Sequence, residues 1–193
     1  MLAEQQRAGH DIHLAVNLSG QSMGDPTILQ HLERELVTLP RRGGLTIEVT
    51  ETVAITDIDR ARSFAEHLES LGCEFALDDF GAGYGSFYYL KHLPFDYLKI
   101  DGTFIREVLS DRADQVLVRS LVQIARELGK RTVAEFVEDQ PTLDKLRDLG
   151  VDYAQGYHIG RPATLNLGAV THPPDFEIGT VDNRYLNEKL SRR

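Results

Sequence analysis

Residues 74–87 read EFALDDFGAGYGSF, a stretch in which an apolar run ends in two aspartates and a glycine-rich turn. The run before Asp78 has the length and composition of a buried β-strand. Charged residues inside an apolar strand must be paired with another group or bind a metal ion if they are buried. This stretch therefore predicts a strand that delivers Asp78 and Asp79 to a functional site.

Five further short runs rich in Val, Ile, Leu, Phe and Tyr alternate with longer segments of helical period. The short runs are 13–19, 45–51, 97–101, 131–137 and, more weakly, 151–157, and the helical segments are 27–39, 57–71, 113–128 and 139–149. Gly72, Gly129 and Gly150 follow the last apolar residue of three of these segments, as helix-ending glycines do. The alternation predicts a βα repeat with parallel strands.

Two architectures fit such a repeat, an open doubly wound sheet and a (β/α)8 barrel. No glycine-rich phosphate turn follows the first run, which weakens the nucleotide-binding form of the open sheet. Polar side chains lie at the C-terminal ends of all the runs, and a barrel gathers these ends around one mouth. We therefore expect an α/β fold, an incomplete TIM-type (β/α)8 barrel with about six of the eight strands. The polar strand-end residues are Asn17, Glu48, Glu51, Asp78, Asp79, Lys99, Asp101, Glu135, Glu138 and Gln155.

The same polar residues could instead cap the helices that follow the strands. Asp57 and Asp139 suit that role better, because they stand at the starts of helical segments. Carboxylate and amide oxygens suit Mg²⁺ or Mn²⁺, with Ca²⁺ as a possible non-catalytic occupant. Adjacent Asp78 and Asp79 could serve two neighbouring ions, an arrangement that suits displacement at phosphorus. Lys99 would add a positive charge that holds the attacking water or the phosphate, or it would form a structural salt bridge.

Composition and charge narrow the function classes. The net charge of −9 and the pI near 5.2 disfavour binding to long nucleic acid. The chain has no apolar run near the roughly 18 residues that a membrane span needs, and its N-terminus lacks a signal-peptide pattern. We therefore expect a soluble, cytoplasmic domain without a membrane segment. The seven histidines form no zinc-binding pair, and the single cysteine, Cys73, is expected to be a packing residue.

Six motifs in order resemble the EAL family of cyclic di-GMP phosphodiesterases. The resemblance spans roughly residues 2–162. The motifs are Asn17-Leu18-Ser19, the Glu-x-Thr-Glu strand end within 47–51, the Asp-Asp-Phe-Gly-x-Gly loop within 78–87, Leu98-Lys99-Ile100-Asp101, the Ala-Glu-x-Val-Glu of 134–138, and Gln155-Gly156-Tyr157 with Gly160-Arg161-Pro162 after it.

The resemblance implies roles for the polar positions of these motifs and for the glycine loop. The first metal ion would be bound by Asn17, Glu48 and Asp78, and the second by Asp78, Asp79 and Glu135. Lys99 would assist the attacking water, and Gln155 would contact water or substrate. Glu51 would brace the loop that contains Gly81 and Gly83, and that loop would influence dimerisation. The family reaction opens cyclic di-GMP to linear pGpG with Mg²⁺ or Mn²⁺, here two ions. Asp101 and Glu138 are weaker candidates for the same site.

The sequence departs from the family at both ends. The Glu-Ala-Leu segment and the first two strands are not found before residue 13, so we expect residues 1–162 to form a barrel that lacks them and hydrolyses poorly. Residues 163–193 would form a C-terminal tail with a strand at 176–181 and a short helix after it. Exposed strand edges predict a homo-oligomer, or a tail that covers the gap.

Two other functions remain open at this point. The chain could be a non-catalytic cyclic di-GMP-binding or protein-interaction module, or an α/β domain whose acidic residues only cap helices and face solvent. In the parent protein, sensor or diguanylate cyclase domains could lie upstream.

Overall fold

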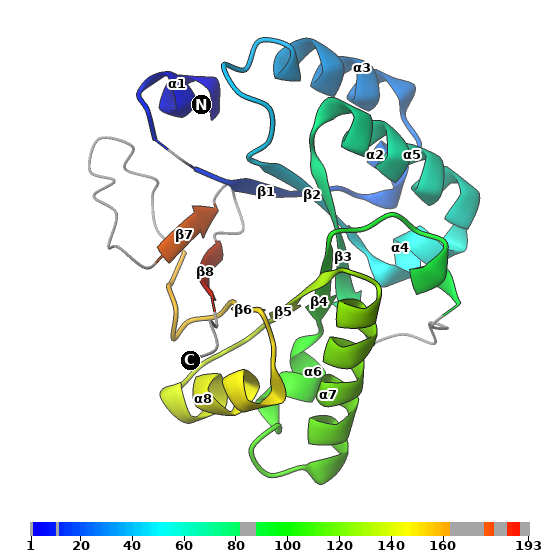
Figure 1. The fold of residues 1–193 in the computed structure, drawn as a ribbon. Helices are drawn as coiled ribbons and strands as arrows, with labels where there is room; N and C mark the ends of the chain where they lie inside the picture. Colours follow the sequence, from blue (N-terminus) through cyan, green and yellow to red (C-terminus); the bar gives the residue numbers. More distant parts are fainter. Residues whose placement is uncertain (1, 11, 82–87, 163–175, 180–184, 190–193) are drawn as a thin grey trace.

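The computed structural model describes residues 2–10, 12–81, 88–162, 176–179 and 185–189. Figure 1 shows a curved sheet with the longer helices packed on its outer side.

Six parallel strands follow one another around the sheet in the order of the chain, from β1 to β6. They are β1 (Leu14–Asn17), β2 (Leu45–Thr50), β3 (Glu74–Phe80), β4 (Tyr97–Ile100), β5 (Arg131–Ala134) and β6 (Tyr153–Ala154). A doubly wound sheet would reverse its strand order at a switch point, whereas a barrel keeps it. The sequential order confirms the predicted incomplete α/β barrel.

The helices connect these strands on the outside (Figure 1). They are α1 (Leu2–Arg7), α2 (Gly20–Met23), α3 (Pro26–Leu36), α4 (Glu51–Thr56), α5 (Ile58–Leu71), the 3-10 helix η1 (Tyr89–Lys91), α6 (Gly102–Arg106), α7 (Arg112–Glu127) and α8 (Gln140–Leu149). The four helical segments expected from periodicity are confirmed as α3, α5, α7 and α8.

The expected capping residues act as the sequence predicts. The Asp57 carboxylate accepts from the backbone N–H of Arg60, and the Asp139 carboxylate accepts from that of Thr142. Gly72 and Gly150 end α5 and α8 in the left-handed conformation, where a side chain would be unfavourable. Gly72 and Gly150 therefore end α5 and α8 shortly before β3 and β6 begin.

The tail adds two antiparallel strands, β7 (Phe176–Gly179) and β8 (Tyr185–Lys189), to the sheet. The strand expected at 176–181 is present as β7, but the short helix expected after it is wrong, because residues 185–189 form β8. β8 pairs with β6, so it hydrogen-bonds along an edge that would otherwise face solvent. β7 also contacts β1 at the other end of the sheet (Figure 1).

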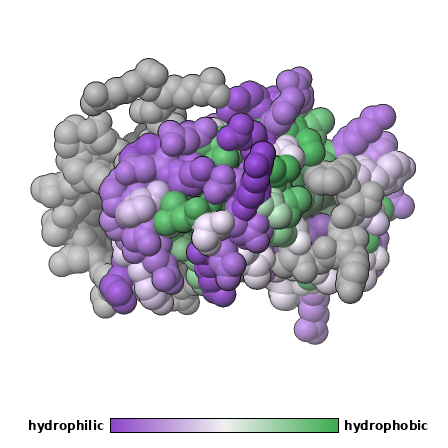
Figure 2. All heavy atoms as spheres, turned by 90° about the horizontal axis from the view of Figure 1, so that it is seen from below, coloured by the Kyte–Doolittle hydropathy of each residue, from purple (hydrophilic) through white to green (hydrophobic). Residues whose placement is uncertain are grey.

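The core lies between the sheet and its helices and is built from aliphatic and aromatic side chains such as Phe75, Leu98 and Leu146. Cys73 is buried just before β3, and burial raises the pKa of its thiol to about 11, as fits a packing residue. The face seen in Figure 2 is mostly hydrophilic, with hydrophobic residues in small separate groups. Among the described residues, no helix combines the length and apolar character needed to cross a bilayer.

Candidate metal centre

Lys99 lies at the centre of a buried group of charges. It stands on β4 with only 2% of its surface exposed. Its ammonium group contacts the carboxylates of Glu48 at 2.9 Å, Asp78 at 2.6 Å and Glu135 at 2.9 Å. Those partners come from β2, β3 and the residue after β5, so the group ties four neighbouring segments of the sheet together. A buried charge of this kind is tolerated because it is paired and hydrogen-bonded.

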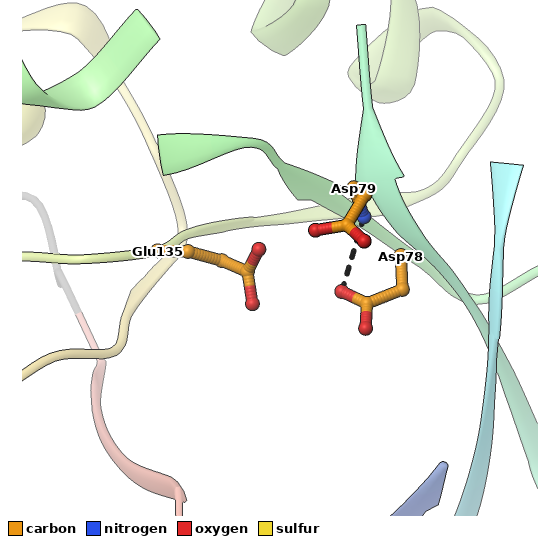
Figure 3. A group of neighbouring side chains, drawn as sticks. All are labelled: Asp78, Asp79 and Glu135. Atoms are coloured by element: carbon orange, nitrogen blue, oxygen red, sulfur yellow. Dashed lines mark hydrogen bonds between the residues drawn. The ribbon is translucent and has the colours of Figure 1, made fainter. Parts of the chain in front are cut away.

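Asp78 and Asp79 are neighbours in β3, yet their carboxylates gather in one cluster with Glu135 (Figure 3). Successive residues of a regular strand point to opposite faces. Here the register between β3 and β4 shifts between Leu77 and Phe80, and Asp79 has a φ of 54°. This irregularity turns both aspartates towards the same space, as bulges near functional sites often do.

The cluster has the spacing of a metal site. One carboxylate oxygen from each of Asp78, Asp79 and Glu135 lies within 4.8 Å of the other two. Burial, and then the nearby charge of Asp78, raise the pKa of Asp79. Burial also raises the pKa of Glu135 to about 7, and it is the largest cause of this shift. The charge of Lys99 acts in the opposite direction and lowers this pKa. These carboxylates therefore need a further positive charge to be ionised together.

Two buried oxygens point to where that charge would be bound. Within the described part of the chain, Glu135 Oε2 and Gln155 Oε1 have no hydrogen-bond partner. Buried polar atoms normally have one, so both are free to bind an ion or a water molecule. With Glu48 included, four carboxylates face one ammonium, which leaves a net charge of −3 when all are ionised. Hard oxygen donors with this excess of negative charge fit Mg²⁺ or Mn²⁺.

A cavity of about 630 Å³ opens above the cluster. Five of the residues expected from strand ends line it, and they are Asn17, Asp78, Asp79, Glu135 and Gln155, together with the weaker candidate Glu138. A ligand in the cavity would therefore meet the carboxylates directly.

The remaining expected residues lie below or beside this cavity. Glu48 and Lys99 are not among its lining residues and form its buried base. Asp101 is the N-cap of α6, where its carboxylate accepts from the backbone N–H of Thr103 at 2.8 Å. For Asp101, the capping interpretation fits the structure better than a ligand role.

Glu51 lies beside the glycine-rich loop. Its Oε2 accepts a hydrogen bond from the backbone N–H of Gly81 at 2.9 Å, although the two residues are thirty positions apart. A Cβ at Gly81 would lie 2.6 Å from Phe104, so this position has no room for a side chain. Gly83 lies outside the described residues.

The whole described domain, with its cluster and cavity, can be compared with known proteins. The sequence model of the family described as EAL domain matches residues 1–162. The chain belongs to the EAL domain family. Among curated relatives, this EAL domain is 41% identical over 154 residues to cyclic di-GMP phosphodiesterase PdeB of Shewanella oneidensis. That match covers 79% of the chain but only 18% of PdeB, so the chain spans less than a fifth of that relative.

Two solved structures are also similar. The EAL domain of FimX from Xanthomonas citri in complex with c-diGMP aligns with a TM-score of 0.81 and 31% identity, over 85% of this chain and 65% of that one. BlrP1 of Klebsiella pneumoniae in a manganese/cy-diGMP complex aligns with a TM-score of 0.75 and 34% identity, over 84% of this chain and 42% of that one.

Several residues that line the cavity of this EAL domain were not named as site residues from the sequence, among them Arg106, Phe136 and Tyr157. Arg106 and Phe136 line one part of the rim, where the guanidinium lies 4.7 Å from the ring centroid. Tyr157 lines another part, and Arg161 lies 4.6 Å from its ring. Tyr157 belongs to a motif that the sequence does display. Arg106 stands on a five-residue helix that is too short to show a periodic signal.

Proposed function

We propose that this domain hydrolyses cyclic di-GMP to linear pGpG in bacterial second-messenger signalling, using two Mg²⁺ or Mn²⁺ ions. The observation that carries the proposal is the negatively charged cluster at the base of a cavity, in which Asp78 and Glu135 are buried and Asp79 is more exposed. The similarity to relatives named as cyclic di-GMP phosphodiesterases supports the substrate. The manganese/cy-diGMP complex of BlrP1 supports the type of metal ion.

The donor set of the chain fits such ions. Asn17, Glu48 and Asp78 would hold one ion, and Asp78, Asp79 and Glu135 the other. Bound divalent ions lower the pKa of water and stabilise the charge that develops at a phosphodiester in displacement.

The side chains themselves orient the reaction. Lys99 holds the carboxylates of Glu48, Asp78 and Glu135 in fixed positions through its three contacts, and its charge offsets part of theirs. Gln155 Oε1 is free to accept a hydrogen bond from a water molecule or the substrate. Arg106 places a guanidinium at the rim of the cavity, where it would attract an anionic phosphodiester.

We also propose a location, domain limits and an assembly state for this chain. We infer a cytoplasmic domain over residues 1–162, followed by a tail over 163–193. The parent protein would carry sensor or diguanylate cyclase domains, and the chain would self-associate. Turnover by this chain alone would be low. The contact between Glu51 and Gly81 supports a role for Glu51 in bracing the loop.

A second candidate function is a cyclic di-GMP-binding module that does not hydrolyse its ligand. The FimX EAL domain in complex with c-diGMP is an example of an EAL domain that binds this ligand. In this chain, Lys99 already neutralises part of the carboxylate charge, which favours a site that keeps its shape without metal ions.

One experiment separates the two functions. The chain is incubated with cyclic di-GMP and Mn²⁺, and both bound ligand and released pGpG are measured. Slow pGpG formation that requires Mn²⁺ and is lost in Asp78→Asn supports the hydrolase. Binding without product supports the binding module, and the absence of both rejects both functions.

A further inference from the structure

The residue after Glu135 has an uncommon backbone conformation. Phe136 has a φ of 55°, a region that bulky residues rarely adopt. Such a conformation persists only when surrounding contacts impose it. Phe136 is also 47% exposed, so burial of its ring in the core does not account for the conformation.

Helix α6 provides the seat for this ring. Gly102 is the first residue of α6, and a Cβ built there would lie 2.7 Å from Cγ of Phe136 and closer still to Cδ2. Four residues later, the Arg106 guanidinium lies 4.7 Å from the centroid of the same ring. The ring is therefore held between a position that has room only for glycine and a cation that favours its face.

The other side of the segment is fixed by the loop after β6. The backbone N–H of Val137 donates to the carbonyl of Gln155 at 2.9 Å, and the N–H of His158 donates to the carbonyl of Val137 at 3.0 Å. A Cβ at Gly156 would overlap the backbone of Val137. The chain from Glu135 to Val137 thus runs between α6 and this loop with little freedom to move.

We propose that Phe136, seated on Gly102 and Arg106, is a positioning residue for Glu135. The backbone of Phe136 sets the direction in which Glu135 leaves β5, with Oε1 on Lys99 and Oε2 without a hydrogen-bond partner among the described residues. If the ring left its seat, Phe136 would relax to a negative φ and the carboxylate of Glu135 would turn away from Lys99. The effect on metal binding rests on the proposed function, but the effect on the Glu135–Lys99 contact does not.

A set of substitutions tests this coupling. Gly102→Ala should displace the ring and weaken Mn²⁺ binding by about tenfold or more, as loss of residues that support metal ligands does. Phe136→Ala should have a similar effect, since it removes the ring and disfavours positive φ. Phe136→Gly should weaken binding less, because glycine adopts positive φ readily. The double variant Gly102→Ala/Phe136→Gly should bind like Phe136→Gly alone.

Mn²⁺ dissociation constants are measured by calorimetry, with Gly129→Ala as a control, since a Cβ at Gly129 meets nothing within 4 Å. A purely structural role predicts that Gly102→Ala lowers the stability of the fold, because its Cβ would clash with the Phe136 ring, and leaves the Mn²⁺ affinity unchanged. Unchanged Mn²⁺ affinity in Gly102→Ala, or no recovery in the double variant, would overturn the proposal.

Crystal structures of the wild type and these variants provide a readout that needs no metal ion. The proposal predicts that the 2.9 Å contact between Glu135 and Lys99 is lost in Gly102→Ala and present in the double variant. If the contact survives in Gly102→Ala, the positioning role is wrong. If the wild type binds no Mn²⁺ while the contact behaves as predicted, only the proposed function fails.

Discussion

Lys99 shows how much of the site depends on single charges. Its ammonium group is buried among three carboxylates, and each contact offsets the cost of removing these groups from water. The sequence predicts that Lys99 joins the site, and it leaves open a structural salt bridge. The structure has Lys99 in salt bridges with residues of the site itself, so the two interpretations describe one arrangement.

Lys99→Ala is expected to lower the free energy of unfolding of the metal-free chain by roughly 3–5 kcal/mol, because it leaves buried carboxylates without their cation. It should also abolish hydrolysis in a complete parent protein. Urea denaturation in EDTA measures the first effect. Lys91→Ala, at an exposed lysine, is the control and should change stability by less than about 0.5 kcal/mol. Equal effects of the two substitutions would contradict this account of Lys99.

Glu135 gives the site a dependence on pH. Its pKa is raised from 4.5 to about 7, so the folded chain holds this proton more tightly than the unfolded chain. Its contribution to stability is therefore fully present below pH 4.5 and is lost as the pH rises to about 7. The loss is on the order of 3 kcal/mol in the metal-free chain.

Glu135→Gln cannot ionise and should escape this loss. The variant should be more stable relative to the wild type at pH 8 than at pH 5, as measured by urea denaturation in EDTA. Glu66→Gln, at an exposed position on α5, should show no such difference. A Glu135→Gln effect of the same size at both pH values would show that Glu135 is not the group responsible.

At the scale of elements, the turn after β3 depends on Gly81. Gly81 has a φ of 99° and donates its N–H to Glu51, and a Cβ there would collide with Phe104. Gly129 also has a positive φ, of 71°, but the space around it is open. Both glycines therefore need a positive φ, and only Gly81 also lacks room for a Cβ.

Gly81→Ala should destabilise the chain more than Gly129→Ala does. Both variants carry the backbone cost of roughly 1–2 kcal/mol for a side chain at positive φ, and only Gly81→Ala adds a steric clash. Thermal unfolding of the two variants against the wild type measures the difference. Equal losses would mean that Phe104 moves aside without cost.

The strands and long helices could be predicted because their signals are local. Apolar runs and helical periods depend on neighbouring residues, and all six parallel strands lie where such runs occur. The predicted ends of the strands were less accurate. The run at 131–137 suggested one strand, but β5 ends at Ala134, because Phe136 adopts a positive φ against Gly102. That contact joins residues far apart in sequence and leaves no local pattern.

The same reasoning applies to the site. Asp78, Asp79 and Glu135 could be predicted because acids stand out at the ends of apolar strands. Their common orientation could not, since it depends on the register shift between β3 and β4. Arg106 was missed because its helix is short and its role depends on where α6 meets the cavity.

At the scale of the whole molecule, the tail affects the edge of the sheet. The chain alternates strands and helices up to β6, and β8 then pairs antiparallel with β6. The segment 185–189 reads YLNEK, and its Asn, Glu and Lys are depleted in strands, so it carries only a weak strand signal of its own. β8 could not be predicted for that reason, because its conformation depends on a partner strand.

A chain that ends at Pro162 should self-associate more than the full chain does, because the β6 edge would be left without β8. Light scattering coupled to size-exclusion chromatography measures the mass of both chains over a range of concentrations. Identical masses for the two chains would show that the tail does not protect this edge.

The most direct test of the account is a calorimetric titration of the chain with Mn²⁺. The account predicts binding that is lost or weakened by about tenfold or more in Asp78→Asn and retained in Glu66→Gln, since only Asp78 belongs to the buried cluster. Binding of Mn²⁺ with the same affinity in wild type and Asp78→Asn, or no binding to the wild type, would contradict it.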